Sequence, residues 1–143
     1  MKKETVGQRG KAAEKLVEAI LKRWNNRADF AYWRLPDSRS ARSFLAAQPG
    51  DICYFSGPHA GIIEIKSAEH PYRIPKAMIS QLPTLMKLEL AGASSVILVL
   101  HKGLDKWRVV LPSQLEQGLP SWDLSAFPLH DTAEAALKST GYF

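Results

Sequence analysis

The sequence predicts an α/β fold in which a mixed central β-sheet is flanked by helices. Apolar side chains between about Lys11 and Trp24 recur every three or four residues, as they do on one side of an amphipathic helix. Downstream, two groups of β-rich segments are separated by a second apolar segment of helical character. The resulting order of one helix, three strands, one helix and two strands is typical of an α/β core.

The N-terminal half contains the first helix and three candidate strands. The helical stripe consists of Ala13, Leu16, Val17, Ile20, Leu21 and Trp24. Residues 30–35 are β-rich and end at Pro36, which favours a turn. Segments 51–56 and 61–67 surround Gly57-Pro58 and are expected to form a hairpin. Residues 39–48 are basic, rich in serine and without a clear period, so we expect a loop or a projecting element there.

The C-terminal half is less regular. Residues 74–90 have a helical pattern with a break or a new start near Pro83 and a stop at Gly92. Segments 95–101 and 107–111 are expected to form the second strand pair, and a short helix is expected at 132–138.

Composition narrows the class of protein. The 143 residues fit a single domain spanning 1–143, and the net charge of +5 suits a polyanionic partner, although many soluble proteins are equally basic. The lone Cys53 excludes an intrachain disulfide and a zinc site built from cysteines. The N-terminus is charged, and no apolar run is long enough for a signal peptide or a membrane span. We therefore expect a cytoplasmic protein that does not contact a membrane.

Acidic and basic side chains gather on the predicted hairpin. Side chains alternate between the faces of a strand, so Glu64 and Lys66 lie on the same face. Asp51 precedes Glu64 by thirteen residues, and this odd separation allows the two to share a face. One hairpin register sets Asp51 opposite Glu64, and the next sets it opposite Lys66. Both registers gather two carboxylates and an ammonium group.

Such a cluster indicates a site for a hard cation. Two adjacent carboxylates repel each other, and Mg²⁺ is commonly held by one or two carboxylates together with waters and substrate phosphate. The metal would activate a water, and Lys66 would orient that water or offset charge that develops on the phosphate. Glu14, just past the edge of the helical stripe, is a further candidate ligand. The ordinary alternative is a solvated Glu-x-Lys pair, but the apolar neighbours Ile63 and Ile65 favour a buried strand.

These residues resemble a known family. Pro49-Gly50-Asp51 followed by Ile63-Glu64-Ile65-Lys66 is similar to the core of PD-(D/E)XK nucleases, which have a restriction-endonuclease-like fold. Gly10-Lys11-Ala12-Ala13-Glu14 resembles the Gly-x-x-x-Glu motif of Holliday-junction resolvases of the Hjc and RecU types, and Gln81 and the apolar segment 96–100 match later elements of RecU. The resemblance covers about residues 7–112, which leaves 113–143 as a C-terminal extension.

The resemblance implies a homodimer that nicks four-way DNA junctions with Mg²⁺, or with Mn²⁺ as a substitute. The metal ligands would be Asp51, Glu64, Glu14 and the main-chain carbonyl of Ile65. Lys66 would act as the catalytic base or stabilise charge, and Gln81 would steady the lysine or the water. A serine before the aspartate would assist, with Ser38, Ser40 and Ser43 as unranked candidates.

The chain also departs from the RecU pattern. RecU proteins have Thr-Asp where this chain has Gly50-Asp51, and their Phe-x-x-His-Gln segment is Met78-Ile79-Ser80-Gln81 here, without the histidine. The segment between Leu35 and Asp51 is also shorter than the RecU stalk. These differences leave the catalytic core intact and concern junction specificity.

Five basic side chains are candidates for contacts with DNA phosphates: Arg34, Arg39, Arg42, Arg73 and Lys76. The alternative for this set is an ordinary solvated surface. Trp24, Trp33 and Trp107 lie in regular elements and are expected in the core, whereas Trp122 is more open to a partner.

The leading hypothesis is therefore a Mg²⁺-dependent, structure-selective DNA endonuclease, most plausibly a junction resolvase in a bacterial cell or a phage-infected host. Three alternatives stay open at this point: a nuclease of the same fold with a restriction-like or repair role, a DNA-binding module that does not cleave, and a structural subunit of a larger assembly.

Overall fold

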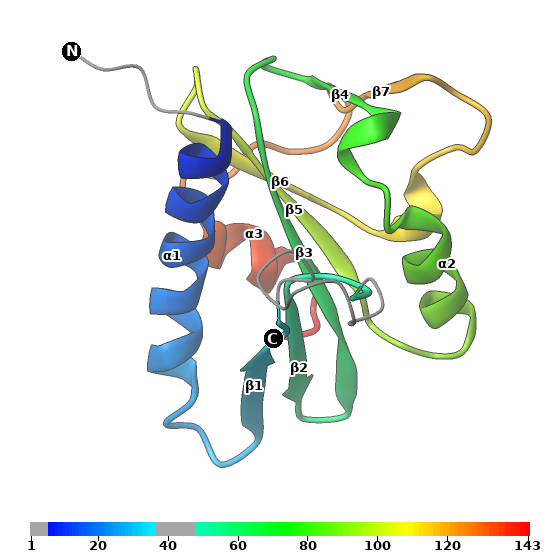
Figure 1. Cartoon of the computed structure of the whole chain (residues 1–143). Helices are drawn as coiled ribbons and strands as arrows, with labels where there is room; N and C mark the ends of the chain where they lie inside the picture. Colours follow the sequence, from blue (N-terminus) through cyan, green and yellow to red (C-terminus); the bar gives the residue numbers. More distant parts are fainter. Residues whose placement is uncertain (1–5, 37–47) are drawn as a thin grey trace.

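The predicted amphipathic helix is present as α1 (Val6–Trp24) in a computed structural model that describes residues 6–36 and 48–143 (Figure 1). Ala13, Val17, Leu21 and Trp24 are buried, so the apolar stripe faces the rest of the chain. Leu16, which the stripe also included, is 53% exposed. No helix in these two described stretches combines the length and apolar character needed to cross a membrane.

Five strands form the main sheet, in the order β1 (Phe30–Arg34), β2 (Ile52–Ser56), β3 (His59–Ala68), β5 (Val96–His101) and β6 (Lys106–Val110). Strands β3 and β5 run parallel, and the other neighbours are antiparallel. The parallel pair needs a crossover connection. It is supplied by β4 (Arg73–Pro75), the 3-10 helix η1 (Lys76–Met78) and α2 (Leu82–Leu90).

The turn between β2 and β3 contains only Gly57 and Pro58, because Ser56 pairs with His59. Gly57 has φ +55°, a conformation that a two-residue hairpin turn requires at this position and that glycine adopts without a steric penalty. The turn fixes the register of the hairpin, which bears on the position of Asp51.

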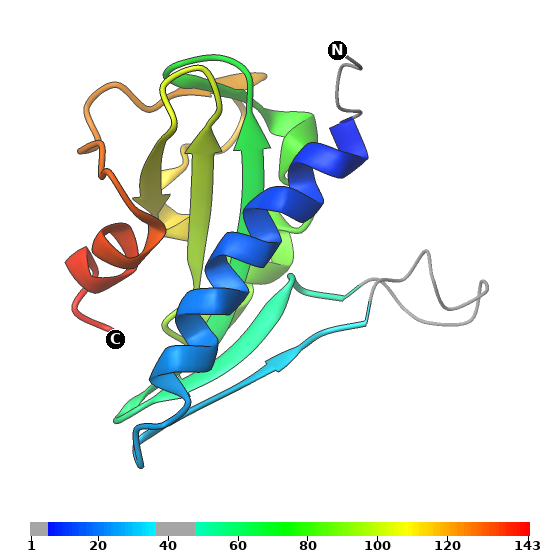
Figure 2. The same ribbon diagram turned by 90° about the vertical axis from the view of Figure 1, so that its left-hand side faces the viewer.

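Helices cover both faces of the sheet (Figures 1 and 2). Helix α1 and the C-terminal helix α3 (Ala133–Ser139) pack on one face, around Ile63, Ile65 and Leu98. Helix α2 packs on the other face, where Leu82 and Leu85 meet Ile97 and Val99. We call these the α1 face and the α2 face of the sheet. The predicted α/β architecture is confirmed.

Two predictions about the crossover and the tail were wrong. Residues 74–90 form the α-helix α2 only from Leu82, because Pro75 and Pro83 have no amide hydrogen for a helix that continues from upstream, and Pro83 is tolerated only in the first turn of α2. Ile74 instead pairs with Trp122 in β7 (Ser121–Asp123). Trp122 is 5% exposed, so it belongs to the core and is not open to a partner.

The segment after Pro112 completes both cores. It begins with the 3-10 helix η2 (Pro112–Gln114), after which Leu115, Trp122 and Leu124 are buried against the α2 face. The predicted short helix is present as α3, and the Thr132 side chain accepts a hydrogen bond from the Ala135 amide at its start.

A buried basic pair ties the ends of the strands to this tail. Arg108 donates to the carbonyls of Pro71 and Phe127, at 2.7 and 3.0 Å. His101 lies 2.8 Å from the carbonyl of His70 through Nδ1, so Nδ1 carries the proton and Nε2 accepts from Arg108 at 3.1 Å. Burial lowers the pKa of His101, which agrees with a neutral ring.

Because α3 belongs to the core, Leu137→Ala should lower the free energy of unfolding by about 2–5 kcal/mol. Leu129→Ala is the matched control, since Leu129 is 40% exposed and its loss should cost about 0.5 kcal/mol or less. Urea denaturation of both variants measures the difference. Equal, small effects would show that α3 does not contribute to the core.

Candidate active site

The hairpin brings Asp51 and Glu64 side by side. Ile52 and Ile63 form the last pair of the ladder, and Asp51 directly precedes that pair, with its amide bonded one residue out of the register. The Ile65 amide donates to Oδ2 of Asp51 at 2.7 Å, and the Asp51 amide donates to the Ile63 carbonyl at 3.2 Å. Of the two registers that the sequence allowed, the chain therefore adopts the one that pairs the two acids.

Glu64 is buried in the middle of the sheet, with 1% of its surface exposed. Its Oε1 lies 3.0 Å from Nζ of Lys66, whereas its buried Oε2 accepts no hydrogen bond from the described residues. A buried oxygen of this kind costs free energy unless a further group satisfies it. The carboxyl groups of Glu64 and Asp51 are close enough to share a proton, as a protonated Glu64 would allow.

Burial and mutual repulsion govern the protonation of the two acids. Burial, together with the negative charge of Asp51, raises the pKa of Glu64 to about 7, although the Lys66 ammonium acts in the opposite direction. Burial also raises the pKa of Asp51, against the hydrogen bond from Ile65 and the charges of Lys66 and Arg34. Strongly perturbed carboxyl groups beside a lysine are typical of functional sites.

Gly50 keeps the space beside the pair open. A Cβ atom at this position would lie 3.0 Å from Oε2 of Glu64 and 2.2 Å from Cγ2 of Ile62. The glycine that departs from the RecU pattern therefore leaves room next to the oxygen that has no partner.

Glu14, which belongs to α1, is held by Arg34 of the edge strand β1. Its Oε2 accepts from Nη2 of Arg34 at 2.8 Å, and Nη1 of Arg34 lies 3.5 Å from Oε1 of Glu18. Within residues 6–36 and 48–143, no three His, Cys, Asp or Glu side chains are grouped to share a metal ion. The structure thus brings together Asp51, Glu64 and Lys66 and keeps Glu14 with Arg34. Asp51 and Glu64 could hold a metal that needs only two carboxylates.

The other predicted site residues are dispersed. Gln81 directly precedes α2, where its Oε1 accepts from the Ser80 hydroxyl at 3.2 Å. Arg73 donates to the Ser121 hydroxyl at 3.2 Å and lies 4.0 Å from Asp123. Arg39, Arg42 and the candidate serines Ser38, Ser40 and Ser43 lie outside the described residues. No contact here tests their predicted roles.

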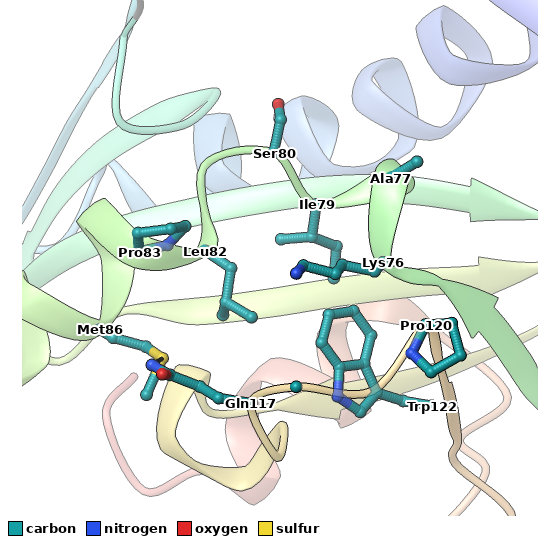
Figure 3. Close-up of a pocket in the computed structure, with 11 residues that line it drawn as sticks. Lys76, Ala77, Ile79, Ser80, Leu82, Pro83, Met86, Gln117, Pro120 and Trp122 are labelled. Carbon is teal, nitrogen blue, oxygen red and sulfur yellow. Dashed lines mark hydrogen bonds between the residues drawn. The ribbon is translucent and has the colours of Figure 1, made fainter.

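A largely apolar cavity of about 650 Å³ lies between the start of α2 and the loop before β7 (Figure 3). Lys76 and Ser80 contribute polar groups to a lining that Trp122 and Met86 dominate. The cavity flanks Gln81 through its neighbours Ser80 and Leu82, but none of Asp51, Glu64 and Lys66 lines it. It is therefore separate from the acid–lysine cluster.

Two features of this region were not predicted from the sequence, the Arg34–Glu14 ion pair and the exposure of Trp33. The pairing of Arg34 with Glu14 follows from the i, i+4 spacing of Glu14 and Glu18, which places two acids on one side of α1. The exposed position of Trp33 could have been inferred from alternation, because Phe30 and Tyr32 occupy the inward positions of β1.

The fold and the cluster define a mixed α/β protein with a buried acid pair and a lysine on adjacent strands. The chain has the fold of the Holliday junction resolvase Hjc from the archaeal hyperthermophile Archaeoglobus fulgidus, with a TM-score of 0.55 and 23% sequence identity. The similarity covers 89% of this chain and 99% of that resolvase. No protein-family model and no curated protein sequence matches the chain.

The raised pKa of Glu64 predicts how stability depends on pH in EDTA. The unfolded chain loses this proton near pH 4.5 and the folded chain near 7, so the folded state holds more protons between these values and loses stability as pH rises. Glu64→Gln removes this loss, so its stability relative to the parent should increase by on the order of 3 kcal/mol from pH 4.5 to 8. Denaturation curves across this range give the free energies of unfolding of the variant and the parent. His101 is present in both proteins, so its opposite effect on the pH dependence cancels when the two values are subtracted. A difference that does not vary with pH would contradict the raised pKa.

Gly50→Ala should destabilise the protein by about 1–3 kcal/mol, because the new methyl group overlaps Ile62 and presses on Glu64. Gly10→Ala is the control, since nothing lies within 4 Å of a Cβ at that position in α1 and alanine should stabilise the helix by about 0.5–1 kcal/mol. Thermal denaturation of both variants tests the contrast. If Gly50→Ala behaved like Gly10→Ala, the space beside Glu64 would not be restricted.

Proposed function

We propose that this chain is a metal-dependent endodeoxyribonuclease of the PD-(D/E)XK class that hydrolyses phosphodiester bonds in branched DNA, and that a four-way junction is its substrate. The observation that carries this proposal is the buried Asp51–Glu64 pair beside Lys66. The pair occurs in a fold shared with a protein described as a Holliday junction resolvase.

The donor set suits Mg²⁺, with Mn²⁺ as a substitute. Asp51 and Glu64 are the proposed ligands, the Ile65 carbonyl is a third, and Glu14 would act directly or through water. Within the described part of the chain Oε2 of Glu64 accepts no hydrogen bond, and Gly50 leaves room beside it, as a further group bound at the site would require. When bound, the metal would polarise the phosphate and lower the pKa of a water.

The chain's own residues would supply the remaining chemistry. Lys66 is positioned by Glu64, 3.0 Å away, and its ammonium would orient the attacking water or offset the charge that develops on the phosphate. Gln81 would steady Lys66 or the water. This arrangement places a cation beside the scissile group without requiring a nucleophilic side chain.

Binding would depend mainly on phosphate contacts. Arg34, Arg39, Arg42, Arg73 and Lys76 are the proposed contacts, and the net charge of +5 favours a polyanion. Symmetric nicking of a four-way junction requires two sites, so the proposal includes a homodimer.

The direct test incubates the protein with a synthetic four-way junction and with a linear duplex, each in Mg²⁺ or in EDTA. We expect paired nicks in the junction in Mg²⁺ only. Equal cutting of the duplex would replace junction resolution with a restriction-like or repair role. Salt-sensitive binding without cleavage would indicate a DNA-binding module, and absence of DNA affinity would refute the nuclease proposal altogether.

Asp51→Asn and Lys66→Met should each lower the cleavage rate by roughly 100-fold or more while junction affinity in EDTA stays nearly constant, because the phosphate contacts are spread over other residues. Asp131→Asn and Lys22→Met are matched controls at exposed positions and should cleave normally. Single-turnover cleavage and filter binding separate the two effects. A Lys66→Met variant with full activity would remove the lysine from the site.

A further inference from the structure

Two aromatic side chains of the β1–β2 hairpin are exposed instead of lying in the core. Trp33 is 58% exposed and Phe55 is 49% exposed. Their ring centroids are 5.8 Å apart with an interplanar angle of 89°, so the rings form a step with two perpendicular surfaces. The sequence led us to expect Trp33 in the core, and that prediction was wrong. We call these two residues the aromatic step.

The aromatic step lies on the same face of the sheet as the acid pair. Trp33 pairs with Cys53, and directly opposite residues share a face. Cys53 and Phe55 alternate with the α1-face residues of β2, so they lie on the α2 face together with Trp33. Asp51 lies beside Glu64, which points to the same face because its neighbours Ile63 and Ile65 are on the α1 face. Trp33 is the diagonal neighbour of Asp51, a separation of roughly 7–8 Å between backbone positions.

The core on the α2 face stops short of the aromatic step. Leu82 and Leu85 pack on β5, and the cluster extends as far as Cys53 and Leu35 but leaves Trp33 and Phe55 exposed. Figure 1 shows β2 and β3 between α2 and β1. The strand order also makes β1 an edge strand. The aromatic step is therefore accessible to a molecule that approaches the acid pair from the α2 face.

The size of the aromatic step favours DNA over a second copy of the chain. Two aromatic side chains that are about half exposed offer roughly 200 Å², whereas a stable protein interface needs about 800 Å² from each partner. DNA that places a phosphate near Asp51 also covers the residues around it, because its major groove alone is about 12 Å wide. Trp33 is closer to Asp51 than this width, so the same DNA would lie over the aromatic step.

We infer that Trp33 and Phe55 form a stacking platform for a base that is left unstacked at a branch point next to the bond that is cut, which makes the site selective for branched or frayed DNA. This inference rests on the proposed nuclease function. Every base has a flat π-face that can stack on an aromatic ring regardless of sequence. A fully paired duplex keeps its bases stacked on one another and cannot offer one without unstacking it. The platform would therefore select a DNA structure and not a sequence.

The other tryptophans make the inference directly testable. Trp24, Trp107 and Trp122 are buried, so acrylamide should quench mainly the fluorescence of Trp33. In EDTA, a saturating forked duplex with two unpaired arms should protect this accessible emission, whereas a blunt duplex should protect it much less. Trp33→Phe should lack the accessible emission with or without DNA.

Affinity provides the second readout. Trp33→Ala should weaken binding of the forked duplex by roughly fivefold to 100-fold and leave blunt-duplex affinity nearly unchanged. Trp33→Tyr should restore most of the preference, which separates stacking from a folding defect. Leu16→Ala is the matched control, because Leu16 is similarly exposed but belongs to α1 on the other face. It should change neither affinity.

Several results would overturn the inference. Unchanged quenching of Trp33 by acrylamide at saturating forked duplex would overturn it, as would an equal loss of affinity for both duplexes in Trp33→Ala. Protection that depends on protein concentration without DNA would instead assign the aromatic step to a second copy. If a protein that cuts DNA gave any of these results, the inference alone would fail. If the chain bound no DNA, both the inference and the proposed function would fail. Fork-specific protection in a chain that never cleaves would refute only the nuclease activity.

Discussion

The register of the β2–β3 hairpin is the constraint on which the site depends. Side chains alternate along a strand, so a shift of one residue would turn Asp51 from the α2 face into the core beneath α1. The two-residue turn at Gly57-Pro58 sets the register at one end of the hairpin. At the other end, the Leu35 amide donates to the Asp51 carbonyl at 2.9 Å, and the Asp51 amide donates to Ile63. The backbone of Asp51 is thus held between two strands.

This geometry has an energetic cost that the rest of the fold must offset. Both acids have raised pKa values because burial disfavours their charged forms, and one oxygen of Glu64 accepts no hydrogen bond from residues 6–36 and 48–143. A strand this central would ordinarily carry apolar side chains on both faces. The two cores on either side of the sheet allow the chain to keep this arrangement, and the tail after Pro112 supplies part of each. Carboxyl groups whose pKa values are raised in this way are typical of sites where a ligand neutralises their charge.

Local patterns were sufficient to predict much of this fold. Helix α1 follows from its apolar stripe, the hairpin from Gly57-Pro58, and α3 from its short periodic segment. The sequence could not choose between two hairpin registers, because each placed the acids on one face. It also could not show that Ile74 pairs with Trp122, because that contact joins segments almost fifty residues apart. Trp33 was misplaced because a tryptophan in a strand favours the core only where a helix covers that face.

Arg34 links the first helix to the acid pair. It binds Glu14 and Glu18 of α1, and its charge slightly opposes the burial that raises the pKa of Asp51. In the absence of a cation, the guanidinium group therefore balances the acids at this margin of the sheet. A divalent ion between Asp51 and Glu64 would reverse the local charge and make the nearby guanidinium unfavourable. Arg34 would then gain by exchanging its carboxylate partners for a DNA phosphate, which an arginine can bind through two parallel hydrogen bonds. Under the proposed function, that exchange would free Glu14 from Arg34, so the Arg34–Glu14 ion pair and the proposed role of Glu14 as a further metal ligand exclude each other.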